Sequence, residues 1–94
     1  MGSDLVHIGF GSILASHRVL AITGPDSAPI KRLVKEGRRK GVCIDMTSGR
    51  KTRAVLILDS GHVVLASLSP DVLASRIAGA PEDAVTAGQV AHEK

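Results

Sequence analysis

The chain has 94 residues, 44% of them hydrophobic, which is enough for one small domain with an aliphatic core. Phe10 is the only Phe, Tyr or Trp, which nearly excludes proteins that read single strands or cage methylated ligands with several aromatic rings. The net charge of +3 is unevenly spread, because residues 18–53 hold ten basic and three acidic residues and the remainder carries −4. Such a block attracts polyanions, although a solvated basic helix face without a partner is the simpler alternative.

Residues 5–23 are predicted to form strand segments, because β-branched and apolar residues dominate this stretch. The string Gly9-Phe10-Gly11 interrupts it. A dinucleotide-binding fingerprint would need a third glycine where Leu14 stands, so Gly9 and Gly11 are interpreted as structural residues of a bulge or tight turn.

An amphipathic helix is predicted next, after a break at residues 24–26. Asp26 or Ser27 is suited to cap it, Pro29 falls in its first turn, and Gly41 is placed to end it. One face would be apolar and much of the rest basic. The apolar positions are Ile30, Leu33, Val34 and Gly37, and the basic ones are Lys31, Arg32, Lys35, Arg38 and Arg39.

The second half is predicted to form an antiparallel meander. Residues 42–47 and 52–58 would pair as a hairpin around Ser48-Gly49, and residues 62–68 would add a further strand. A short helix is expected from Ser69 onward. The fold class is therefore α+β, with a single domain over residues 1–78 and a flexible tail over residues 79–94, although the Ala-rich part of that tail also permits a weak helix.

No feature of the sequence marks an enzyme, a metal site or a cofactor site. Cys43, Asp45 and His62 would have to meet across strands to act together, and nothing nearby activates the thiol. The four histidines lack metal-ligand spacing. The lone cysteine and the absence of a long apolar run predict a cytoplasmic protein with no membrane association.

The basic residues at the predicted hairpin tip are the strongest candidates for contacts with a phosphate backbone. Arg50 and Lys51 follow Gly49, where long side chains protrude beyond a sheet, and Arg53 extends the patch two residues along. On the predicted helix, Lys31, Arg32 and Lys35 are second-rank candidates.

Several strings together resemble the RemA family of small bacterial regulators of extracellular-matrix and biofilm genes. They are His7-Ile8-Gly9-Phe10-Gly11, Ser27-Ala28-Pro29-Ile30-Lys31-Arg32, Ile44-Asp45 and Thr47-Ser48-Gly49-Arg50-Lys51-Thr52-Arg53-Ala54-Val55. The resemblance runs from about residue 5 to residue 76. The combination of A-P-I-K-R with G-R-x-T-R-A-V is much more specific than either string alone.

The resemblance implies a ring-like homo-oligomer that binds double-stranded DNA through basic residues on its surface. The family's basic positions carry over onto Arg18, in the second strand region, and onto Arg50 and Lys51. Lys51 stands where the family commonly has a second arginine, so its charge is kept while the two-pronged guanidinium is lost. Ser48 replaces a bulkier residue, and Pro29 is interpreted as structural, supporting a subunit interface.

The sequence therefore predicts a cytoplasmic, non-enzymatic transcriptional regulator whose partners are double-stranded DNA and further copies of itself. It would contact phosphates mainly and read sequence through DNA shape. The alternative is an interaction scaffold whose basic surface binds structured RNA or an acidic protein.

Overall fold

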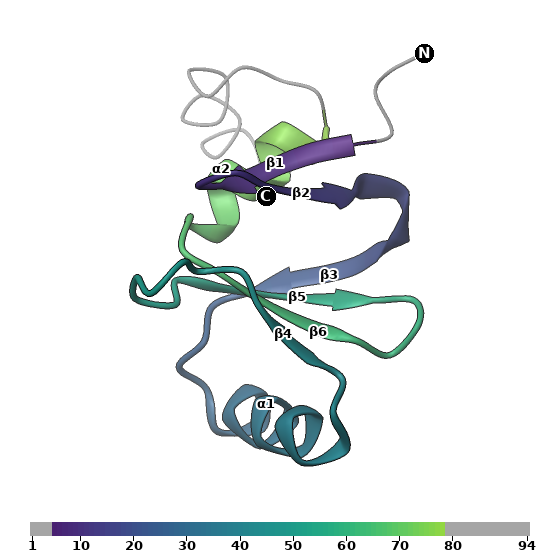
Figure 1. Cartoon of the computed structure of the whole chain (residues 1–94), viewed down its shortest axis with the longest axis vertical. Helices are drawn as coiled ribbons and strands as arrows, with labels where there is room; N and C mark the ends of the chain where they lie inside the picture. The colour runs from purple at the N-terminus through teal and green to yellow at the C-terminus, as the bar shows by residue number, and fades with distance from the viewer. Residues whose placement is uncertain (1–4, 79–94) are drawn as a thin grey trace, which may run out of the picture.

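The computed structural model describes residues 5–78, which form three layers (Figure 1). A hairpin with a short helix covers one face of a four-stranded sheet, and a longer helix covers the other face. In chain order the elements are β1 (Leu5–Gly9), β2 (Ser12–Ala15), the 3₁₀ turn η1 (Ser16–Arg18), β3 (Val19–Thr23), α1 (Ala28–Lys40), β4 (Cys43–Asp45), β5 (Ala54–Leu58), β6 (Val63–Ala66) and α2 (Pro70–Ile77).

The four-stranded sheet is mixed, with the strand order β3-β5-β6-β4. β5 pairs antiparallel with both β3 and β6, so Val55 lies opposite Thr23 on one side and Leu65 on the other. β4 pairs with β6 in parallel, with Cys43 opposite Val63. The predicted hairpin between residues 42–47 and 52–58 is therefore wrong, because β6 lies between these strands. The antiparallel pairing of β5 with β6 is confirmed.

Both faces of the central strands are buried, by alternating side chains. Val55, Val63 and Leu65 pack against the apolar face of α1. Their neighbours Leu56 and Val64, both fully buried, point the other way, toward β1, β2 and α2. Strands covered on both faces have continuous apolar sequences, which explains the apolar runs in this half of the chain.

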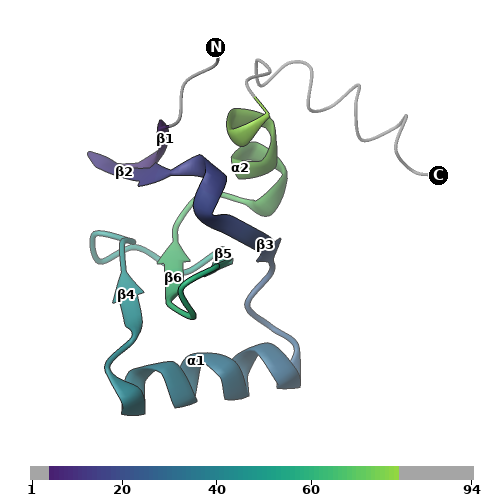
Figure 2. The same cartoon turned by 90° about the vertical axis from the view of Figure 1, so that its right-hand side faces the viewer.

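Helix α1 follows the capping chemistry predicted from the sequence. The Ser27 hydroxyl accepts a hydrogen bond from the Ile30 N–H at 3.3 Å, and Pro29 lies in the first turn. Gly41 ends the helix in the left-handed conformation, with φ of 78°. Between these two ends, α1 crosses one face of the sheet from the side of β3 to the side of β4 (Figure 2).

The β1–β2 hairpin turns through three consecutive residues with positive φ, namely 115° at Gly9, 50° at Phe10 and 85° at Gly11. The φ of 115° at Gly9 is one that residues with a side chain rarely adopt, so the backbone conformation favours glycine there. The predicted turn at this string is confirmed.

The α+β class is thus confirmed for the described residues, with two helices and mixed pairing in place of a wholly antiparallel meander. No helix within residues 5–78 has the length and hydrophobicity needed to cross a bilayer. The predicted flexible tail over residues 79–94 lies outside the described residues.

Candidate nucleic-acid interface

The loop of residues 46–53 carries three of the predicted DNA-binding residues and crosses the end of β6. At its start the Met46 N–H donates to the Leu65 carbonyl at 2.9 Å, and at its finish the Arg53 N–H donates to the Ala66 carbonyl at 2.8 Å. Arg50 and Lys51 therefore lie on a loop over the end of the sheet, which corrects their predicted place at a hairpin tip.

A tight turn at Thr47–Arg50 fixes the middle of this loop. Ser48 and Gly49 have φ values of 56° and 80°, and the Arg50 N–H donates to the Thr47 carbonyl at 3.0 Å. Thr47 is itself buried, and its hydroxyl and N–H both donate to the Asp45 carboxylate, at 2.6 and 2.9 Å. These two hydrogen bonds lower the pKa of Asp45, because they stabilise its charged form. The turn thus has a rigid base.

The cations on the loop have no acidic partners. Arg50, Lys51 and Arg53 are all exposed, and none of them lies within 4.0 Å of a carboxylate in the described part of the chain. Arg50 does have one close neighbour, because its Cζ lies 3.5 Å from the centre of the Phe10 ring. The loop therefore presents three positive charges that an external anion can approach.

Helix α1 adds basic residues beside the loop. Lys31 and Arg38 line a cavity of about 170 Å³ between α1 and the sheet, whose wall includes Thr52 of the loop. Lys35 lies on the same side of the helix, one turn from each of these two cations. Lys31, Lys35 and Arg32 are exposed and have no ion-pair partner within residues 5–78.

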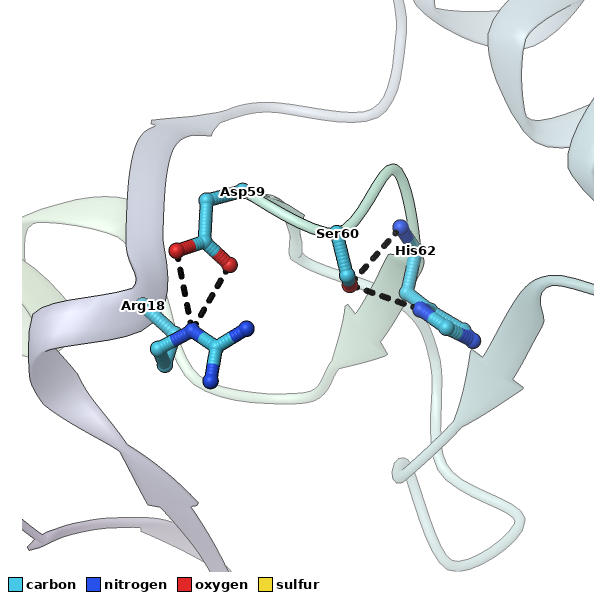
Figure 3. Close-up of polar contacts among 4 residues, drawn as sticks. All are labelled: Arg18, Asp59, Ser60 and His62. Carbon is cyan, nitrogen blue, oxygen red and sulfur yellow. Dashed lines mark hydrogen bonds and ion pairs between the residues drawn. The ribbon is translucent and has the colours of Figure 1, made fainter.

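Arg18 lies elsewhere, at the opposite end of the sheet. It ends η1 just before β3, a small correction to its predicted strand position. Its Nε donates to both Asp59 carboxylate oxygens, at 2.7 and 2.9 Å (Figure 3). Arg53 and Asp59 flank the five residues of β5, so six steps along an extended strand place Arg18 about 20 Å from the loop. One copy of the chain thus has two separate basic sites.

The residues predicted to be structural occupy positions that suit this role. Gly9 and Gly11 shape the β1–β2 turn that carries Phe10. Pro29 lies in the first turn of α1 and is exposed, so its ring is accessible to a neighbouring molecule.

The residues considered for catalysis are not joined into a site. The Asp45 carboxylate is bound by Thr47, and the His62 Nδ1 lies 2.7 Å from the Ser60 hydroxyl (Figure 3). Among the described residues no hydrogen bond links any two of Cys43, Asp45 and His62, and no group of three or more His, Cys, Asp or Glu is arranged to hold a metal ion.

The sequence did not identify Phe10, Asp59 or Arg38 as parts of the candidate interface. Phe10 contacts Arg50 and Asp59 pairs with Arg18 across large separations in the chain, which no local pattern reveals. Arg38 was visible only as one more basic position of the helix, and its place beside Thr52 depends on how α1 docks on the sheet.

Comparison with known proteins gives a consistent result. The family model described as RemA-like, extracellular matrix regulatory protein A-like, matches residues 5–77. A protein of Dehalococcoides mccartyi is 61% identical over 74 residues, covering 79% of this chain and 77% of that protein. A protein of Cyanothece sp. is 54% identical, covering 81% and 84%, and one of Dictyoglomus thermophilum is 53% identical, covering 84% and 93%. All three carry the name "putative regulatory protein".

Proposed function

The chain belongs to the RemA-like family, and on that basis we propose that it is a regulator that binds double-stranded DNA as a homo-oligomer. Its contacts are mainly with phosphates, and its targets are genes of the extracellular matrix. It acts without catalysis, cofactor or metal.

The observation that carries the proposal is a set of exposed cations at one end of the sheet that have no acidic partner within residues 5–78. Arg50, Lys51 and Arg53 are exposed on a loop with a rigid base, and Lys31 of α1 lies next to it across a shared cavity. Cations without acidic partners keep their full attraction for a phosphate backbone, and each one that neutralises a phosphate releases counterions from the DNA.

The position of Arg18 supports an assembly of several copies. In one copy Arg18 and the loop lie about 20 Å apart at opposite ends of the sheet, so a single domain presents two small basic sites instead of one broad surface. A head-to-tail arrangement that closes into a ring repeats both sites around its circumference. Weak contacts then add through multivalency along one DNA molecule.

The proposal is tested by the dependence of duplex binding on salt. The logarithm of the binding constant should fall linearly with the logarithm of salt concentration, by about 0.9 for each phosphate neutralised. The double variant Arg50→Ala with Lys51→Ala should bind more weakly and show a shallower slope, measured by anisotropy of a labelled promoter-length duplex between about 50 and 200 mM salt.

A matched control removes the same charge elsewhere. Arg39 already pairs with Glu36 at 2.7 Å, and Lys40 is the last residue of α1. The double variant Arg39→Ala with Lys40→Ala should therefore keep most of the slope. Equal slopes for the wild type and the Arg50/Lys51 variant would refute the role of these two residues.

Two further measurements test the class of partner and the assembly. The first is a competition assay in which structured RNA or an acidic protein is added to the complex with promoter duplex. If either competitor displaces the duplex at matched charge, the scaffold alternative is favoured. Light scattering with and without duplex measures the mass of the assembly, and a monomeric mass in both samples would refute oligomeric binding. Concentration must be followed by refractive index, because the chain has no Trp or Tyr.

A further inference from the structure

Phe10 is an exposed aromatic residue in a protein that otherwise has none. It is the only Phe, Tyr or Trp in the chain, and 51% of its surface is exposed. The buried core consists of Val, Leu, Ile and Ala, so the ring contributes little to it. Core packing therefore does not explain why a phenyl group stands at this position.

The backbone at Phe10 makes the choice of residue more unusual. Its φ of 50° lies in the left-handed region, where glycine, asparagine and aspartate are favoured and a bulky residue is an outlier. A turn flanked by Gly9 and Gly11 would form more easily with a small or polar residue at its centre. Strained residues that persist in a fold are concentrated at functional sites, which directs attention to what the side chain touches.

The side chain touches Arg50. The guanidinium Cζ lies 3.5 Å from the ring centre, well inside the distance at which a cation is attracted to an aromatic face. Both partners stand on turns with positive φ, Phe10 between β1 and β2 and Arg50 after Ser48 and Gly49. This contact thus joins two turns from different layers of the fold.

Stacking changes what Arg50 offers to a ligand. A free arginine side chain samples many rotamers and loses that freedom when it binds. With one face held on the ring, the guanidinium is pre-oriented while its N–H edge stays available, which favours a two-pronged hydrogen bond to phosphate oxygens. Lys51, the next residue, has no such support among the described residues and acts as a point charge.

We propose that Phe10 is a positioning residue for DNA binding, which holds the Arg50 guanidinium so that it makes a directed contact with a phosphate. This inference rests on the proposed function. It assigns different roles to adjacent cations, with a fixed geometry at Arg50 and attraction alone at Lys51.

The first experiment compares three chains by duplex binding. Phe10→Leu keeps an apolar side chain but removes the aromatic face, and should weaken binding about two- to fivefold for each Arg50 engaged. Its salt slope should match that of the wild type, because no charge is lost. Phe10→Trp, which restores an aromatic face, should recover wild-type affinity.

A double-mutant comparison separates positioning from a general structural role. In the Arg50→Ala background, Phe10→Leu should have no further effect, because the group that the ring holds is gone. An equal loss in both backgrounds, or wild-type affinity in Phe10→Leu itself, would overturn the proposal.

Thermal unfolding followed by circular dichroism provides the second readout. Phe10→Asn places a residue that tolerates positive φ at the strained position, so it should melt at or above the wild-type temperature while binding DNA as weakly as Phe10→Leu. A melting temperature clearly below the wild type would contradict the strain argument. If the wild type itself failed to bind duplex, both the proposed function and this inference would be refuted. If the wild type bound duplex and the Phe10→Leu variant bound it equally well, only the inference about Phe10 would be refuted.

Discussion

The ion pair between Arg18 and Asp59 places an internal carboxylate in competition with DNA. The Arg18 Nε lies 2.7 and 2.9 Å from the two Asp59 oxygens, so a phosphate that takes this guanidinium must share it with Asp59 or displace it. Asp59 also repels an approaching phosphate directly. Replacing Asp59 by asparagine removes the charge and keeps the shape, and the backbone hydrogen bond from the Asp59 N–H to the Arg18 carbonyl, at 2.9 Å, is untouched.

The size of the effect follows from exposure. The two side chains are 51% and 40% exposed, and an ion pair this accessible contributes at most about 1 kcal/mol to stability. Asp59→Asn should therefore tighten duplex binding by up to about fivefold for each Arg18 engaged. The same change should lower the melting temperature by no more than about 4–8 °C.

The matched control is Glu36→Gln, which removes the same charge from a second exposed ion pair. Glu36 holds Arg39 on α1 at 2.7 Å, and within residues 5–78 it pairs with neither Arg18 nor the cations of the loop. Both variants change the net charge equally, so anisotropy titrations at equal salt separate the effect of the Asp59 carboxylate beside Arg18 from the effect of net charge. An Asp59→Asn variant that bound duplex no more tightly than Glu36→Gln would refute the competition between Asp59 and DNA.

Three further changes test the fold. Gly37→Ala should stabilise the protein by about 0.5–1 kcal/mol in urea unfolding, because it favours the helix and an added Cβ would meet Cys43 and Val63 at 3.5 Å, an ordinary contact; a loss of stability would contradict this packing. Ser67→Ala should be neutral or stabilising by up to about 1 kcal/mol in the same assay, because the buried Ser67 hydroxyl has no hydrogen-bond partner among the described residues. Thr47→Val should raise the pKa of Asp45 toward 3.8. The hydrogen bonds that lower this pKa stabilise the fold at pH values above the pKa of Asp45 in the unfolded chain. This stabilisation is lost as the pH falls through the lower pKa of Asp45 in the folded protein. The variant should therefore be less stable than the wild type at neutral pH and approach it in acid, and a difference that persisted at all pH values would contradict this assignment.

Local chemistry made much of the fold predictable from the sequence. Ser27, Pro29 and Gly41 delimit α1 because capping and left-handed termination depend on a few neighbouring residues. The turns at Gly9-Phe10-Gly11 and Ser48-Gly49 were predicted for the same reason, and both have positive φ. What failed was the pairing of strands. The turn at residues 48 and 49 exists, but the chain continues over the end of β6 instead of folding back on β4.

The apolar sequence of β6 already indicated that this strand lies in the centre of the sheet. All four residues of β6 are buried, and a short, continuously apolar strand is typical of a sheet covered on both faces. Its order relative to β4 is decided by the docking of α1, through contacts between residues distant in sequence. The same holds for the candidate interface. Its cations could be identified from the sequence, but the partners of Arg18 and Arg50 are distant in sequence and could be identified only from the fold.

The contact between Phe10 and Arg50 has a practical consequence for spectroscopy. Because the chain has no other phenyl group and no indole or phenol, its phenylalanine ring protons give a single assignable set of signals in a proton NMR spectrum. The ring current acts on the Arg50 side chain 3.5 Å away, so the arginine resonances are displaced as long as the two groups remain stacked. An unlabelled sample titrated with duplex thus reports on this single contact through signals that the protein already has.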